Sequence, residues 1–325
     1  MTKLHPESLQ ARNEVGKFLK EHASPGQRLL LAVSGGFDSL ALAHMVMHFQ
    51  EEVGYLVSAL TVDHALQEQS AQWTKATVER LNNLGIDATS VMVKVDLQSA
   101  EGLEAAARAA RYEALEKHAA FIGAEAILLA HTLDDQAETV LLRLAQGGST
   151  NSIAGMRAVS QNLWRPLLGV RRNVLREYLT QHHIDAIDDP QNYDRRFTRV
   201  RVRQELLPQL IDVLGKDVVG TLATTAKLAG LDSDALEVLT DTRFAEVITE
   251  NAVDCEKLRQ ELPAFQYRIV YRWLKSIGSM RQSFEHVELT VRLANQNQMK
   301  GPIRVPGLEI HKESGTLRAV RRPHG

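Results

Sequence analysis

The stretch that decides the fold is Arg28–Ser39, RLLLAVSGGFDS, in which an apolar run leads directly into a loop of small residues. The run is typical of a buried strand, and helix-period apolar positions begin at Ser39. Glycines leave backbone N–H groups open to an anion, and a helix amino terminus adds partial positive charge. The loop therefore predicts a phosphate site built from Ser34, Gly35, Gly36, Phe37, Asp38 and Ser39.

Asp38 places a carboxylate beside the expected phosphates, which is unfavourable unless a Mg²⁺ ion bridges the two. The sequence thus predicts Asp38 as a metal ligand. Two other phosphate loops are excluded, because there is no Gly-Lys-Ser/Thr ending and no Gly-x-Gly-x-x-Gly. An ordinary strand–turn–helix connection of small residues is the structural alternative.

The first half of the chain alternates apolar runs with amphipathic stretches. Buried strands are expected at 28–33, 55–63, 88–95 and 126–131, and helices at 39–53, 70–84, 101–120 and 133–145. This alternation predicts an α/β fold, a Rossmann-like parallel sheet with helices on both faces. Ligands of such sheets bind beyond the carboxyl ends of the strands.

The character of the sequence changes after residue 145. A glycine-rich loop at 146–155 is followed by a polar, turn-rich stretch, by helical patterns from about 215 to 295, and by two or three short strands within 301–318. We therefore predict a catalytic domain at 1–212 and a smaller, mostly helical domain with a short β tail at 213–325.

Composition limits the class of protein. The chain has 325 residues, a net charge of -2 and a single cysteine, Cys255, so neither an internal disulfide nor a site made of several cysteines can form. The amino terminus has no signal-peptide pattern, and no apolar run approaches the roughly 18 residues of a membrane span. We expect a cytoplasmic protein with no membrane partner.

Further motifs follow the loop in a fixed order. They are VDH at 62–64, EAAARAARY at 104–112, LAHTLDDQAETVLLRL at 129–144, RPLL at 165–168 and DPQN at 189–192, ahead of RVRVR at 199–203. Ser-Gly-Gly-x-Asp-Ser after the first strand resembles the signature of the ATP pyrophosphatase (PP-loop) superfamily. The whole set, over roughly residues 28–210, is similar to the tRNA(Ile)-lysidine synthetase family.

This resemblance implies an ATP-dependent ligase that forms a carbon–nitrogen bond, with ATP and Mg²⁺ as cofactors. Its partners would be an isoleucine tRNA with a CAU anticodon, free L-lysine and ATP, and residues 213–325 would contact the tRNA. The wobble cytidine would be adenylated and its C2 oxygen replaced by lysine. A homodimer is left open. The sequence departs from the family pattern in its glycine-rich loop at 146–156, which lacks an arginine and one glycine, and at Gln191.

Asp135 and Glu138 lie three residues apart on one helix face, after the fourth strand. The family's Asp-Asp-x-x-Glu-Thr run matches here, and two carboxylates suit the ammonium group of lysine. Asp135 is also the candidate catalytic base. The structural alternative is that Thr132 caps the helix and the carboxylates suit its dipole.

Arginine and histidine provide the remaining candidates. Arg111 is predicted to stabilise the α-phosphate or orient the cytosine, with a structural Glu104–Arg108 pair as the alternative reading of this helix. His131 is predicted to line the nucleotide pocket, against a purely structural role. Arg195, Arg196, Arg199, Arg201 and Arg203 crowd nine residues without an acid, which predicts a tRNA-binding patch, although such a stretch is usually a solvated face.

Three rival functions use the same fold. A tRNA thiolase with this ATP site delivers sulfur through several cysteines, which a single cysteine argues against. A small-molecule amidating or nucleotide synthase needs an ammonia source and has no use for the arginine cluster. A non-catalytic ATP or RNA sensor would not need both Asp38 and Asp135.

Overall fold

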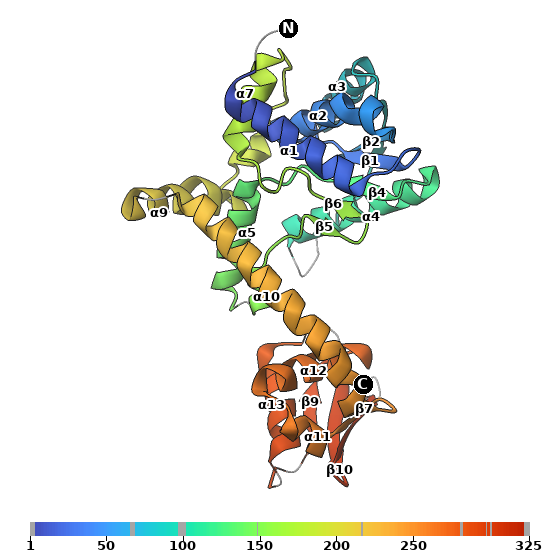
Figure 1. The fold of residues 1–325 in the computed structure, drawn as a ribbon, viewed down its shortest axis with the longest axis vertical. Coiled ribbons are helices and arrows are strands. Elements are labelled where there is room, and N and C mark those ends of the chain that lie inside the picture. The colour runs from blue at the N-terminus through green and yellow to red at the C-terminus, as the bar shows by residue number, and fades with distance from the viewer. Residues whose placement is uncertain are drawn as a thin grey trace. The chain divides into compact units, whose positions relative to one another are not determined.

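The computed structural model describes residues 4–65, 69–96, 102–147, 149–215, 217–279, 282–296, 298–299 and 301–321. The chain divides into two compact units, Met1–Gly230 and Leu231–Gly325. The division falls within the long helix α10 (Val218–Val247), drawn in orange in Figure 1. The domain boundary near residue 212 and the tRNA-binding role of the second domain stay predictions.

The first unit is built on a six-stranded sheet in the order β3-β2-β1-β4-β6-β5. Its strands are β1 (Arg28–Ala32), β2 (Leu56–Asp63), β3 (Asp87–Met92), β4 (Ala126–Leu128), β5 (Val159–Ser160) and β6 (Leu163–Trp164). Strands β3, β2, β1, β4 and β6 run parallel, and β5 is antiparallel. The predicted α/β class is confirmed, and β1 lies between β2 and β4 at the centre.

Helices alternate with these strands as expected. They are α1 (Pro6–His22), α2 (Phe37–Val53), α3 (Ser70–Asn83), α4 (Leu103–Ile122), α5 (Leu133–Ala145), α6 (Thr150–Ile153) and α7 (Arg172–Gln181). The sequence did not identify α1. Of the helix expected at 101–120, Glu101 lies outside the described residues.

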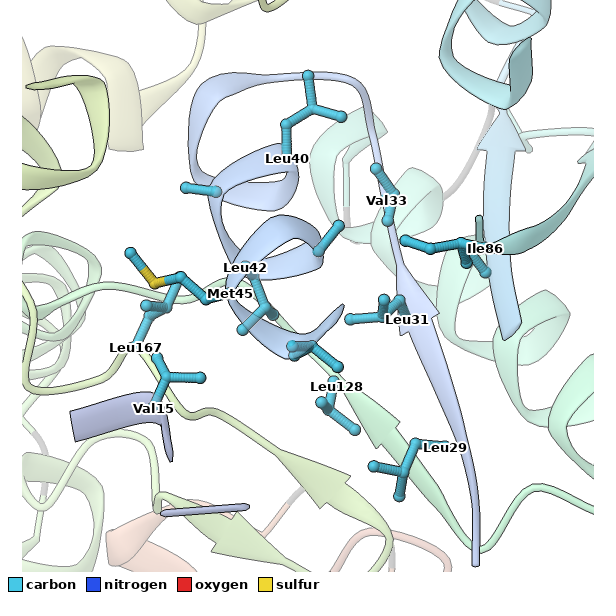
Figure 2. Close-up of a cluster of buried hydrophobic side chains, with 14 of the residues drawn as sticks. Val15, Leu29, Leu31, Val33, Leu40, Leu42, Met45, Ile86, Leu128 and Leu167 are labelled. Carbon is cyan, nitrogen blue, oxygen red and sulfur yellow. The ribbon is translucent and has the colours of Figure 1, made fainter. Parts of the chain in front are cut away.

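The alternation of β1 side chains explains the two layers of helices. Leu29 and Leu31 point into a core formed with α1, α2, α3 and α7, part of which Figure 2 shows. Leu30 points to the opposite face, where it packs against α4. A central strand that is buried on both faces reads as a continuous apolar run. Each fully buried leucine contributes about 1.5–3 kcal/mol of burial free energy.

A broken helical segment follows the 3-10 turn η1 (Pro190–Tyr193). It consists of α8 (Thr198–Arg201), a π-helical turn η2 (Val202–Leu206) and α9 (Leu207–Leu214). Val202 and Leu207 pack against α5 and the start of α10. This packing brings the arginines of α8 and η2 next to the first turns of α5.

The second unit has its own core. A five-stranded sheet, in the order β7-β8-β11-β10-β9, consists of β7 (Ile248–Thr249), β8 (Ala252–Asp254), β9 (Ile303–Val305), β10 (Leu308–Glu313) and β11 (Thr316–Arg321). Helices α11 (Cys255–Gln260), α12 (Pro263–Ser276) and α13 (Phe284–Asn295) share its hydrophobic core. The strands predicted in the tail are confirmed, whereas β7 and β8 interrupt a stretch expected to be helical.

Within the described parts of the chain, no helix has both the length and the apolar character needed to cross a bilayer.

Candidate active site

The loop after β1 leaves the amino terminus of α2 open. Gly36 is the N-cap, and no side chain caps the helix. The hydroxyl of Ser39 instead donates to the carbonyl oxygen of Gly36 at 2.9 Å and accepts from the backbone N–H of Ser34 at 3.2 Å. Because the first N–H groups of α2 have no side-chain partner, the loop presents backbone donors to an anion.

Gly35 cannot be replaced without changing this loop. Its φ is +85°, a left-handed conformation that favours glycine, and an added Cβ would lie 2.3 Å from Oγ1 of Thr77. Its carbonyl oxygen also accepts a hydrogen bond of 2.9 Å from the backbone N–H of Ile187. This glycine therefore joins the phosphate loop to the segment that leads to η1.

Arg172, the first residue of α7, connects the carboxylates of two elements. Its Nε donates to Oδ2 of Asp38 at 3.1 Å, and its Nη2 donates to Oδ1 of Asp135 at 2.8 Å. Its backbone N–H donates to Oδ2 of Asp134 at 2.8 Å. One guanidinium thus joins the phosphate loop at the start of α2 to the first turn of α5.

Glu138 lies under a cluster of guanidinium groups. Arg199 donates to it through Nε at 2.8 Å, and Arg203 through Nε at 2.6 Å and Nη2 at 3.0 Å. Arg172 lies 3.3 Å from its Oε1. The Glu138 side chain has 0% exposure, so these arginines satisfy and enclose it. Removing one partner of such a buried network is destabilising.

The structural alternative for Thr132, a helix cap, is present in the structure. Its hydroxyl accepts from the N–H of Asp135, and Oδ2 of Asp135 accepts from the N–H of Thr132 at 2.9 Å, which forms a capping box. The remaining oxygen of Asp135, Oδ1, faces Arg172, Arg199 and Arg203. The capping role and a ligand-binding role therefore use different oxygens of one carboxylate.

The two aspartates differ in their electrostatic setting. Burial raises the pKa of Asp38 to about 6, against the opposing effect of Arg172. Burial also acts to raise the pKa of Asp135, but Arg172 and Arg199 outweigh it and hold that pKa below its ordinary value. Asp135 is consequently a weak base in this form of the protein.

The two aspartates and the arginines that contact them, Arg172, Arg199 and Arg203, line one cavity of about 310 Å³ beyond the carboxyl ends of β1 and β4. A second cavity of about 120 Å³ adjoins it beside β2 and contains Asp63 and His64. Arg111 and Ser34 line both cavities. Because α/β sheets bind ligands at this edge, the two cavities form the candidate nucleotide and substrate site.

Arg111 and His131 both line the larger cavity, and their roles towards the nucleotide stay predictions. Burial and the nearby Arg108 lower the pKa of Arg111. Burial lowers the pKa of His131 to about 3, so its imidazole is neutral at pH 7, and its buried Nδ1 has no hydrogen-bond partner among the described residues. Arg108 lies over the ring of Tyr112 at 4.9 Å, and no salt bridge to Glu104 is recorded among the described residues.

The structure divides the predicted arginine patch. Arg199 and Arg203 turn inward to Asp135 and Glu138, with side-chain exposures of 22% and 28%. Arg195, Arg196 and Arg201 are exposed, but each contacts an acid that flanks the run, either Asp194 or Glu205. A role of the patch in tRNA binding stays a prediction.

The sequence analysis did not predict that Arg172 contacts both Asp38 and Asp135. Distance along the sequence gives no sign that the first residue of α7 contacts carboxylates of α2 and α5. The available signal was the RPLL motif: Leu167 is buried in the core, and the N–H of Val170 bonds to its carbonyl oxygen, which fixes the turn before α7.

The glycine-rich loop is anchored by Gln136 of α5. The side chain of Gln136 accepts from the N–H of Met156 at 2.8 Å and donates to its carbonyl oxygen at 3.0 Å. Gly155 has a φ of +63°, and an added Cβ would lie 2.6 Å from Gln136. Gly148 of this loop lies outside the described residues. The closing end of the loop is thus tied to the site helix.

Comparison with known proteins identifies the domain family of the first unit. Residues 7–210 match the PP-loop domain family. Among solved structures, a U34-tRNA thiolase from Methanococcus maripaludis with its [4Fe-4S] cluster is similar in fold. Its TM-score is 0.59 and its identity 14%, over 68% of this chain and 78% of the thiolase.

Several relatives are similar over most of their length. The tRNA(Ile)-lysidine synthase of Rhodococcus opacus is 40% identical over 84% of this chain and 82% of the relative. That of Streptomyces coelicolor is 40% identical over 90% and 85%. That of Salinispora tropica is 37% identical over 98% of each chain. The chain therefore belongs to the tRNA(Ile)-lysidine synthase family, with its PP-loop domain at residues 7–210.

Proposed function

We propose that this protein joins lysine to C2 of the wobble cytidine in the CAU anticodon of an isoleucine tRNA, with conversion of ATP to AMP and pyrophosphate. The observation that carries the proposal is that an open phosphate loop and a carboxylate–arginine network line the same cavity. Family membership supplies the reaction, and this cavity supplies groups suited to each of its steps.

The first step uses the phosphate loop. The C2 oxygen of the cytidine attacks the α-phosphorus of ATP, the bond to the β-phosphate oxygen breaks, and pyrophosphate leaves. The backbone N–H groups at the start of α2 are suited to the departing phosphates, and Arg111, at the junction of the two cavities, to the charge that develops on the α-phosphate. The product is an O-adenylated cytidine.

Asp38 is suited to hold Mg²⁺. Its Oδ1 is buried and has no hydrogen-bond partner among the described residues, and carboxylate oxygen is the ligand type that Mg²⁺ prefers. A bound Mg²⁺ ion would neutralise charge on the phosphates. The raised pKa of Asp38 is consistent with a carboxylate that lacks a full set of partners in the free protein.

The second step uses lysine. Its ε-amine attacks C2, and AMP leaves with the former C2 oxygen. Free lysine has a pKa near 10.4, so deprotonation at pH 7 costs about 4.6 kcal/mol. We propose that Oδ1 of Asp135 binds this nitrogen, and that Glu138 acts indirectly by holding Arg199 and Arg203.

The arginines around Asp135 offer a way to lower that cost. Arg172, Arg199 and Arg203 lie 2.8, 3.3 and 3.4 Å from Oδ1 of Asp135. Burial lowers the pKa of an ammonium group, and the three guanidiniums offset the carboxylate of Asp135, which would otherwise raise that pKa. The site can therefore favour the neutral amine without a strong base, which Asp135 is not.

Incubation of the protein with unmodified isoleucine tRNA, ATP and labelled lysine tests the proposal. Nucleoside analysis should find labelled lysidine at the wobble position, together with AMP and pyrophosphate. Incorporation of sulfur from a sulfide donor, without incorporation of lysine, would instead identify a thiolase. Cys255 gives no support to that rival, because it is buried in the second unit and burial raises the pKa of its thiol.

A further inference from the structure

Five arginines line the larger cavity, but they differ in whether a carboxylate pairs with the guanidinium. They are Arg111, Arg172, Arg176, Arg199 and Arg203. Arg172, Arg199 and Arg203 are ion-paired with the site carboxylates. Arg111 lines both cavities. Arg176 remains, and it is the residue with no assigned role.

Arg176 lies one turn after Arg172 on α7 and is exposed. Its guanidinium lies over the ring of Phe37, 4.9 Å from the ring centroid. Among the described residues, no carboxylate is recorded as an ion-pair partner of Arg176. The cavity therefore has an uncompensated guanidinium on its exposed side, held on an aromatic ring of the phosphate loop.

A structural role is the simplest alternative. An exposed cation–π contact is weakly stabilising, and on this reading Arg176 merely covers Phe37. Two observations favour a ligand. Phe37 is the first residue of α2, so its ring fixes the guanidinium beside the open helix amino terminus. The guanidinium also faces a cavity, where its planar fork matches two oxygens of a phosphate group.

We propose that Arg176 binds a phosphate group at the exposed side of the cavity and that Phe37 positions its guanidinium. This inference rests on the proposed function, which brings two phosphate sources to the cavity: the polyphosphate of ATP and the backbone of the tRNA. Both present the same oxygen chemistry to Arg176. Binding measurements with each ligand alone separate the two sources.

The test compares the wild type with Arg176→Gln and Arg176→Lys. One arm measures binding of ATP with Mg²⁺ by calorimetry without RNA. The other measures tRNA binding at several salt concentrations without ATP. Arg176→Gln should weaken one of the two about tenfold or more, since a charge-assisted hydrogen bond contributes roughly 1.5–3 kcal/mol. If the source is tRNA, the salt slope should also fall by about 0.9.

Phe37→Leu tests the position of the guanidinium, Arg176→Lys tests its charge, and Lys17→Gln is the control. Phe37→Leu keeps the arginine but removes its aromatic support, so it should weaken the same arm by less than Arg176→Gln. Lys17→Gln removes one exposed cation of α1, outside the cavity lining, and should change neither arm. Arg176→Lys should recover part of the lost affinity, because it restores the charge without the planar fork.

The outcomes are distinguishable from failure of the proposed function. If the wild type makes lysidine and binds both ligands, yet Arg176→Gln binds both as tightly as the wild type, the inference about Arg176 is overturned alone. If the wild type makes no lysidine, the proposed function fails, whereas loss of affinity in either arm would still support a phosphate ligand at Arg176.

Discussion

Arg199 donates from its Nε to Oε2 of Glu138 at 2.8 Å, which joins α8 to α5 across 61 residues of sequence. The Glu138 side chain is fully buried, and Arg199 is mostly so. A hydrogen bond to a charged, buried partner contributes roughly 1.5–3 kcal/mol. This contact therefore stabilises the folded protein as well as the arrangement of the site.

Arg199→Ala should lower the free energy of unfolding by about 2 kcal/mol, since Glu138 would keep only Arg172 and Arg203. The melting temperature should fall by roughly 4–8 °C. Arg201→Ala is the matched control, because the Arg201 side chain is 62% exposed and its ion-pair partner among the described residues is Glu205, at 3.6 Å. Its effect should stay within about 0.5 kcal/mol. Equal melting temperatures for the two variants would contradict the inward role of Arg199.

Arg201, unlike the inward-facing Arg199, should affect tRNA binding more than the stability of the protein. An exposed arginine that reaches a phosphate contributes about 0.9 to the slope of log affinity against log salt concentration. We expect Arg201→Ala to weaken tRNA binding and to reduce this slope without changing ATP binding. The measurement is a tRNA titration at several salt concentrations. An unchanged slope would exclude Arg201 from the RNA contact.

The fold was predictable because its signals are local. The apolar run of β1, the glycines after it and the helix-period residues of α2 lie within 26 consecutive residues, 28–53. The same holds for Thr132 and Asp135, whose capping box spans a single turn. Patterns of this range give the order of strands and helices and the edge of the sheet at which a ligand binds.

The arginines were less predictable because their partners are distant in sequence. Arg199 and Arg201 are neighbours of the same type in a strongly basic run. Only the packing of Val202 and Leu207 on α5 decides that Arg199 turns to Glu138 while Arg201 stays exposed. The short strands β7 and β8 were missed for a related reason, since two or three residues hold no measurable periodicity.

Asp38 is predicted to be essential for adenylation but not for folding. Asp38→Asn should reduce Mg²⁺-dependent ATP binding by at least about 100-fold, because direct ligands matter more than the outer partners that alter metal affinity 10–100-fold. Burial raises the pKa of Asp38 to about 6, so the fold disfavours its ionised form. A neutral, isosteric amide should therefore leave the melting temperature at pH 7.5 unchanged within a few degrees.

Exchange of labelled pyrophosphate into ATP in the presence of tRNA measures the same step. Asp38→Asn should show none. If the folded variant exchanged pyrophosphate as fast as the wild type, Asp38 would have no role in adenylation.

The protein should lose stability in mild acid through His44 of α2. Its Nδ1 lies 2.7 Å from the hydroxyl of Tyr178, and burial together with His182, His48 and Arg12 lowers its pKa to about 4. The unfolded chain binds this proton near pH 6.5, whereas the folded protein does not. The contribution of His44 is thus fully present above pH 6.5 and is lost as the pH falls towards 4.

The loss should be below about 1.4 kcal/mol per pH unit, because His44 is only partly buried. His44→Gln keeps a polar partner for Tyr178 but cannot titrate. Its melting temperature should consequently fall less between pH 7 and pH 5 than that of the wild type. Parallel curves for the two proteins would show that His44 is not shifted.

Substitutions of Asp135 and of Glu138 should have different effects on the Michaelis constant for lysine. Oδ1 of Asp135 faces the cavity, whereas Glu138 is enclosed by arginines. Asp135→Asn removes the carboxylate oxygen that would accept a hydrogen bond from the lysine nitrogen, while an amide can still accept the hydrogen bonds from Thr132. The Michaelis constant for lysine should rise roughly 10–100-fold, against a small change for ATP.

Glu138→Gln instead loosens Arg199 and Arg203, so it should lower the melting temperature and raise both Michaelis constants together. Steady-state kinetics with each substrate varied in turn measures the difference, and equal effects of Asp135→Asn on lysine and ATP would count against direct binding of lysine by Asp135.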